Sequence, residues 1–145
     1  MVVRMAASRL LDRVHVLIVD EDPAVCAALA DIVTAHGGLA NVASSADRAV
    51  EFAAIVKPSV VVSDLRLGGG KSGVWLLEQF RAGALGSVPV IATSAFAGDD
   101  ALAASLPFSA FLRKPVDARE LCALILGAVD RLGREPRPRR GPAAG

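Results

Sequence analysis

The chain has 145 residues, 53% of them hydrophobic and 21% charged, which fits one globular domain with a sizeable core. It holds no apolar run of about 20 residues that would span a membrane. Its first residues also lack the long apolar segment of a secretory signal, so we expect a cytoplasmic location. Both cysteines, Cys26 and Cys122, fall in helical patterns, where they are expected to be small buried hydrophobes rather than disulfide partners or metal ligands.

The net charge of +1 hides an uneven distribution of charge along the chain. Residues 1–13 carry three arginines and one aspartate, and residues 134–145 carry four arginines and one glutamate, which leaves nine bases and thirteen acids for residues 14–133. We therefore predict an N-terminal extension (1–13), an acidic folded domain (14–133) and an Arg/Pro-rich tail (134–145). The tail lacks apolar periodicity and is predicted to be disordered.

Strands and helices are predicted to alternate along the folded domain. An apolar strand at 14–19 leads into a helix that Asp22 caps and Pro23 opens. A short strand at 39–43, a second helix and a strand at 60–64 follow. The strand at 60–64 is rich in valine and is predicted to be buried on both faces.

The second half of the domain continues the alternation. Its elements are a helix at 73–81, a strand at 89–94, a short helix opening at 98–100, a strand at 109–113 and a helix whose start is marked by Asp117 and Glu120. Five strand-helix repeats with short connections predict an α/β fold: a doubly wound five-stranded parallel sheet with helices on both faces.

The chemically distinctive residues are scattered in sequence, but each lies at the carboxyl end of a predicted strand: Asp20, Glu21, Asp64, Ser94 and Lys114. In open α/β sheets ligands bind beyond the carboxyl ends of the strands, so the fold would collect these side chains. Clustered carboxylates repel one another unless a cation is present, and their oxygens suit Mg²⁺, which predicts a magnesium site. The set suits phosphoryl transfer: Asp64 would attack phosphorus in line, while Lys114 and the Ser94 hydroxyl would hold phosphoryl oxygens.

At the segments 16–23, 60–67, 94–95 and 111–115, the chain resembles the receiver domain of two-component response regulators, a flavodoxin-like module phosphorylated on aspartate. The resemblance covers roughly residues 14–132. It implies the following roles: Asp64 as phosphoacceptor, Asp20, Glu21, Asp64 and the backbone carbonyl of Arg66 as metal ligands, Lys114 as the phosphoryl-binding lysine, and Ser94 and Phe111 as switch residues. The peptide bond between Lys114 and Pro115 is commonly cis in this family.

The same resemblance implies a function as a Mg²⁺-dependent signalling receiver. A sensor histidine kinase or a histidine phosphotransfer protein would donate the phosphoryl group, and the domain would catalyse only its own phosphorylation and dephosphorylation. The face formed by the fourth helix, fifth strand and fifth helix would then bind a downstream protein or a second copy of the chain. Only residues 134–145 remain after the domain, too few for a DNA-binding or enzymatic output domain, so a stand-alone receiver is expected.

Three features depart from the usual receiver pattern. Glu21 stands where aspartate is commoner, and its extra methylene changes the reach of its oxygens. The loop at 68–73 is one residue longer than usual and lacks a proline, which favours flexibility. Phe96, two residues after Ser94, is placed to shield an acylphosphate from water, and we therefore predict faster dephosphorylation of Phe96→Ala.

Two alternatives remain open at the level of sequence. Gly70, Lys71 and Ser72 imitate the end of a phosphate-binding P-loop, although Leu65 occupies the position where that motif needs its first glycine. Saturable binding of Mg-ATP or Mg-GTP would favour this nucleotide-binding alternative. The second alternative is a receiver fold used as an interaction module that phosphorylation does not regulate. In that case Asp64→Asn would have no functional effect.

Overall fold

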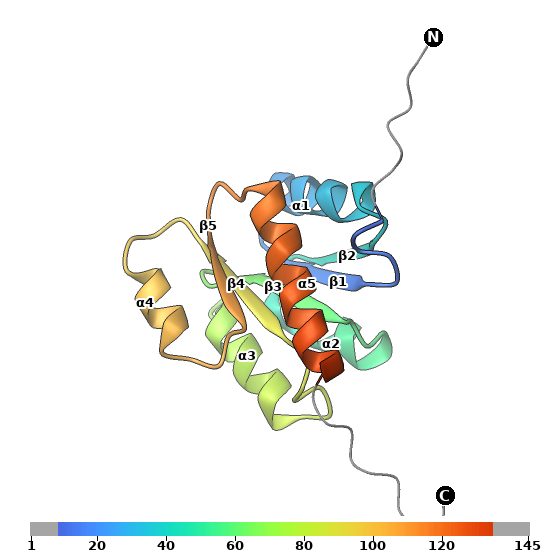
Figure 1. Ribbon diagram of the computed structural model, residues 1–145. Helices are drawn as coiled ribbons and strands as arrows, with labels where there is room; N and C mark the ends of the chain where they lie inside the picture. The colour runs from blue at the N-terminus through green and yellow to red at the C-terminus, as the bar shows by residue number, and fades with distance from the viewer. Residues whose placement is uncertain (1–8, 135–145) are drawn as a thin grey trace, which may run out of the picture.

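Five short parallel strands alternate with five helices in the computed structural model, which describes residues 9–134 (Figure 1). The strands are β1 (His15–Val19), β2 (Leu39–Ala43), β3 (Val60–Asp64), β4 (Val90–Ser94) and β5 (Ala110–Arg113). The helices are α1 (Pro23–Ala35), α2 (Ala46–Ile55), α3 (Gly73–Ala82), α4 (Asp99–Ala104) and α5 (Ala118–Arg134). All ten elements lie within two residues of where the sequence predicts them.

The strand order is β2-β1-β3-β4-β5, and every neighbouring pair is parallel. Successive residues of a strand point to opposite faces of the sheet. On β1, Val16 and Ile18 therefore pack with α1 and α5, while Leu17 and Val19 pack with α2 and α3. The predicted doubly wound, flavodoxin-like sheet with helices on both faces is confirmed, and β3 lies at its centre.

The helices begin where side chains cap their free N–H groups. Asp22 accepts a hydrogen bond of 2.9 Å from Ala24 N at the start of α1, where Pro23 is the first helical residue. Ser45 caps α2, and Asp117 Oδ1 accepts a 2.9 Å bond from Glu120 N near the start of α5. These capping residues explain why the helix starts are readable from short stretches of sequence.

The folded core includes a residue from the predicted N-terminal extension. Leu11 is fully buried in the core between the sheet, α1 and α5, and its backbone N–H donates to the carbonyl of His36 at 2.9 Å. Residues that precede the predicted domain start at 14 thus take part in its packing. The predicted tail at 134–145 lies, except for Arg134, outside the described residues, as do residues 1–8.

Both cysteines are free and buried in this same core, as expected for small apolar residues. Burial raises the pKa of the Cys122 thiol above its ordinary value. None of the helices within residues 9–134 is long and apolar enough to cross a membrane.

Candidate functional site

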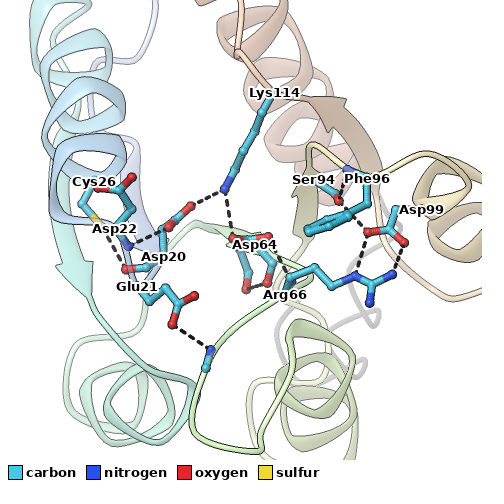
Figure 2. A network of polar contacts seen from close by, with 12 residues as sticks. Asp20, Glu21, Asp22, Cys26, Asp64, Arg66, Ser94, Phe96, Asp99 and Lys114 are labelled. Atoms are coloured by element: carbon cyan, nitrogen blue, oxygen red, sulfur yellow. Dashed lines mark hydrogen bonds and ion pairs between the residues drawn. The ribbon is translucent and has the colours of Figure 1, made fainter.

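The carboxyl ends of four strands meet at one edge of the sheet and bring the predicted polar residues together. Asp20 follows β1, Asp64 ends β3, Ser94 ends β4 and Lys114 follows β5. Figure 2 shows their side chains gathered in the space above the sheet edge. The convergence follows from the parallel topology, because residues far apart in sequence reach the same edge.

The ammonium group of Lys114 lies between two carboxylates. Its Nζ donates to Asp20 Oδ2 at 2.7 Å and to Asp64 Oδ2 at 2.9 Å (Figure 2). The Lys114 side chain is 19% exposed, and both acids are more buried still. Burial alone would lower the pKa of Lys114, but the bonds to Asp20 and Asp64 outweigh that effect and raise it. The lysine is therefore held charged against the predicted phosphoacceptor.

Backbone N–H groups orient the other oxygen of each carboxylate. Asp20 Oδ1 accepts from Asp22 N at 2.9 Å, and Asp64 Oδ1 accepts from Arg66 N at 3.0 Å. Each acid is thus fixed by its own loop on one side and by Lys114 on the other. The Lys114 backbone also donates to the carbonyl of Ser94 at 2.9 Å, and its peptide bond to Pro115 is cis.

Glu21, the second acid of the predicted metal site, faces the loop after β3. Its Oε2 accepts from Gly68 N at 3.1 Å (Figure 2). Among residues 9–134, no three His, Cys, Asp or Glu side chains are arranged as a ready metal site. The donor types still fit a hard cation, since Asp20, Glu21 and Asp64 offer only carboxylate oxygens at one sheet edge.

Ser94 does not point its hydroxyl at Asp64. Its Oγ lies 2.5 Å from Asp99 Oδ2, to which it donates, and it accepts a hydrogen bond from Phe96 N at 3.0 Å (Figure 2). The hydroxyl is completely buried. The predicted switch residue is therefore at the site, but its hydrogen bond is made to a different acid.

Asp99 is a site residue that the sequence did not reveal, because an acid in the first turn of a short helix is expected to be an exposed capping group. It is only 3% exposed. The Arg66 guanidinium donates to both of its oxygens, from Nε at 3.1 Å and from Nη2 at 2.8 Å. These bonds, together with that from Ser94, lower the pKa of Asp99.

Two phenylalanines, Phe96 and Phe111, flank the site. The Phe96 ring is 57% exposed and lies against the Arg66 guanidinium, 4.9 Å from ring centre to Cζ. The shielding of an acylphosphate on Asp64 by Phe96 stays a prediction. Phe111 is half-buried and packs against a small cluster of Leu65, Ala92 and Ala103.

The glycine-rich loop after β3 uses its polar residues for structural contacts. Gly69 and Gly70 adopt positive φ angles of 78° and 82°. Lys71 Nζ bonds Asp47 Oδ1 at 2.6 Å and lies 4.6 Å from the centre of the Trp75 ring. Ser72 caps α3 by accepting from Trp75 N. The two polar residues of the P-loop-like segment, Lys71 and Ser72, thus have partners within the fold.

Comparison with known proteins identifies the family. A family model of the response regulator receiver domain matches residues 16–126. A CheY-like response regulator receiver domain protein from Methanospirillum hungatei JF-1 has 22% identity and a TM-score of 0.77, covering 87% of this chain and 99% of its own. A sensor protein from Polaromonas sp. JS666 has 27% identity and a TM-score of 0.76, covering 83% of this chain and 98% of its own.

A response regulator receiver domain protein from Clostridium thermocellum is also similar, with 22% identity, a TM-score of 0.73, and coverage of 81% of this chain and 95% of its own. No curated protein sequence matches the chain. The family match spans most of the described residues, and the fold agrees with it. The chain therefore belongs to the response regulator receiver domain family of two-component signal transduction.

Proposed function

We propose that the chain accepts a phosphoryl group on Asp64 from a sensor histidine kinase or a histidine phosphotransfer protein. The observation that carries this proposal is the position of Lys114, whose ammonium bonds both Asp20 and Asp64. A fixed cation beside a carboxylate nucleophile can stabilise the negative charge of an incoming phosphoryl group. Membership of the receiver family supports a signalling function rather than that of a classical enzyme.

The proposed reaction is a displacement at phosphorus. A carboxylate oxygen of Asp64 attacks, the new O–P bond forms as the P–N bond to the donor histidine breaks, and the released imidazole nitrogen takes up a proton. Lys114 keeps its ammonium beside Asp64 and neutralises a phosphoryl oxygen. Ser94, once its hydroxyl turns towards Asp64, donates to a second phosphoryl oxygen.

Mg²⁺ is the proposed cofactor. The carboxylates of Asp20, Glu21 and Asp64 and the backbone carbonyl of Arg66 would hold it. When bound, it supplies additional charge neutralisation to the phosphoryl group. The support for this assignment is chemical, because all four groups offer the oxygen donors that Mg²⁺ prefers.

The proposed output is a change in the surface built from α4, β5 and α5. Ser94 ends β4 and Phe111 lies on the neighbouring strand β5, where the register pairs Ala92 with Phe111. Movement of Ser94 towards the phosphoryl group would shift the loop before α4, and Phe111 would repack against its cluster. A downstream protein or a second copy of the chain would read this change.

Labelling with acetyl phosphate tests the phosphorylation. The wild-type chain should gain one phosphoryl group by intact-mass spectrometry, only with Mg²⁺ present, and Asp64→Asn should gain none. Asp31→Asn is the matched control, since it removes an exposed acid on α1. Equal labelling of Asp64→Asn and wild type would refute the assignment of the acceptor.

The donor and the two alternatives need separate measurements. Phosphotransfer from a panel of histidine kinases should label the wild type at a rate that depends on the kinase. If neither kinases nor acetyl phosphate modify the chain, and Asp64→Asn keeps full biological function, it is an unregulated interaction module. Saturable binding of Mg-ATP that Lys71→Gln abolishes would instead support the P-loop alternative.

A further inference from the structure

The only hydroxyl proton of Ser94 is already used in the resting structure. A serine hydroxyl has one proton to donate and two lone pairs to accept with. Ser94 Oγ donates to Asp99 Oδ2 at 2.5 Å and accepts from Phe96 N at 3.0 Å. It cannot donate to a phosphoryl oxygen on Asp64 until it leaves Asp99.

Arg66 connects this arrangement to the phosphoacceptor. Its backbone N–H bonds Asp64 Oδ1, and its guanidinium bonds both oxygens of Asp99 (Figure 2). One residue thus contacts both carboxylates. The same guanidinium satisfies Asp99 when Ser94 turns away, so the buried acid is not left without a partner.

We propose that Asp99 is a positioning residue that holds the Ser94 hydroxyl away from Asp64, and that a phosphoryl group on Asp64 competes with Asp99 for this hydroxyl. The inference rests on the proposed function, because the competitor is the phosphoryl group. It adds that Asp99 sets how readily the domain switches: the stronger its bond to Ser94, the larger the fraction of molecules in the resting arrangement.

Arg66 affects the competition between Asp99 and the phosphoryl group for the Ser94 hydroxyl, and its effect is opposite to that of Asp99. Without the guanidinium, Ser94 becomes the main remaining partner of the buried Asp99 carboxylate, and the bond between them should strengthen. Removal of Asp99 should favour the phosphoryl-bound arrangement, whereas removal of the Arg66 side chain should oppose it. A merely structural role of Asp99 predicts instead that both changes weaken the site.

Binding of beryllofluoride, a phosphoryl mimic, tests the proposal by calorimetric titration in excess Mg²⁺. Asp99→Ala should bind about tenfold more tightly than wild type, the change expected when one charge-assisted hydrogen bond no longer competes. Arg66→Gln should bind more weakly in the wild-type background but have no further effect in Asp99→Ala. Asp100→Asn is the control, because Asp100 is a neighbouring exposed acid whose carboxylate lies 3.9 Å from Arg113. The Asp100→Asn protein should bind beryllofluoride as tightly as wild type.

A second variant and an NMR measurement distinguish a failure of the inference about Asp99 from a failure of the proposed function. If Asp99→Ala does not fold, Asp99→Asn takes its place in the titration. This variant should also bind beryllofluoride more tightly than wild type. The Ser94 ¹³Cβ shift, measured without beryllofluoride, should change in Asp99→Ala but not in Asp100→Asn. Wild-type binding with no tightening in the Asp99 variants would overturn this inference alone. A wild type that takes up neither acetyl phosphate nor beryllofluoride would overturn the proposed function, while an altered Ser94 shift would still support the contact with Asp99.

Discussion

Gly73 packs directly against the backbone of Asp64: a Cβ at position 73 would overlap the Asp64 carbonyl oxygen. The Gly73 N–H also donates to the carbonyl of Leu65 at 3.1 Å. The start of α3 therefore packs directly against the end of β3, next to the backbone of the proposed phosphoacceptor. Only glycine permits this close approach.

Gly73→Ala should lower the free energy of unfolding by about 1–3 kcal/mol, because the added methyl group meets backbone that cannot move aside like a side chain. Urea titration followed by circular dichroism measures the change. Gly127→Ala is the matched control, since a Cβ at that position within α5 would meet nothing within 4 Å. It should raise stability by up to about 1 kcal/mol, and equal effects of the two variants would contradict the packing at Gly73.

Lys114→Gln should destabilise the metal-free protein by about 2 kcal/mol. The substitution leaves Asp20 and Asp64 facing each other without their shared cation, but the partial exposure of Lys114 reduces the loss below that of a fully buried pair. Mg²⁺ should then raise the melting temperature of the variant more than that of wild type, because the ammonium no longer competes for the same oxygens.

Lys57→Gln, which removes an exposed lysine, should leave both the stability and the Mg²⁺ response unchanged. The same Lys114→Gln protein should be labelled more slowly by acetyl phosphate, because it lacks the cation beside Asp64. Faster labelling would show that Lys114 restrains the acceptor rather than assisting it.

Cys122 should react slowly with thiol reagents in the native protein. Its raised pKa lowers the thiolate fraction at neutral pH, and its burial restricts access. Alkylation by iodoacetamide, followed by mass spectrometry in Cys26→Ser, should be slow in buffer, rise with pH, and become fast in urea. Fast alkylation in buffer would show that the segment around Cys122 opens readily.

The elements that sequence predicts correctly are those set by local chemistry. A valine-rich run makes β3 a buried central strand, and Asp22 and Asp117 mark helix starts through bonds to residues two or three positions away. The convergence of Asp20, Asp64 and Lys114 was also predictable, since parallel strands bring their carboxyl ends to one edge.

The remaining features depend on contacts between distant residues that leave no local pattern. The burial of Asp99 depends on Arg66, 33 positions earlier, and this pair decides where the Ser94 hydroxyl points. Leu11 is buried because its segment bonds the end of α1 at His36. Neither the contact of Asp99 with Arg66 nor that of Leu11 with His36 follows from spacing or periodicity in the sequence. Both became visible only in the folded structure.

Glu21 accepts a hydrogen bond from Gly68 in the loop after β3, and shortening its side chain should make that loop more mobile. The contact exists because Gly68 has no Cβ, which would overlap Glu21 Oε2. Glu21→Asp cannot reach Gly68 N, and Gly68→Ala pushes the carboxylate away from the other side. Both variants should speed hydrogen exchange of the residue 68 amide by about 3- to 10-fold, the effect of losing one ordinary hydrogen bond.

Glu51→Asp, the same shortening at an exposed position of α2, should leave that exchange unchanged. The exchange of the residue 68 amide should also be measured with Mg²⁺ present. If Glu21 leaves Gly68 to complete the proposed metal site, Mg²⁺ should speed exchange of the Gly68 amide in wild type and have little effect in Glu21→Asp, where the bond is already absent. Protection of the Gly68 amide that neither substitution nor Mg²⁺ alters would show that Glu21 does not hold the loop.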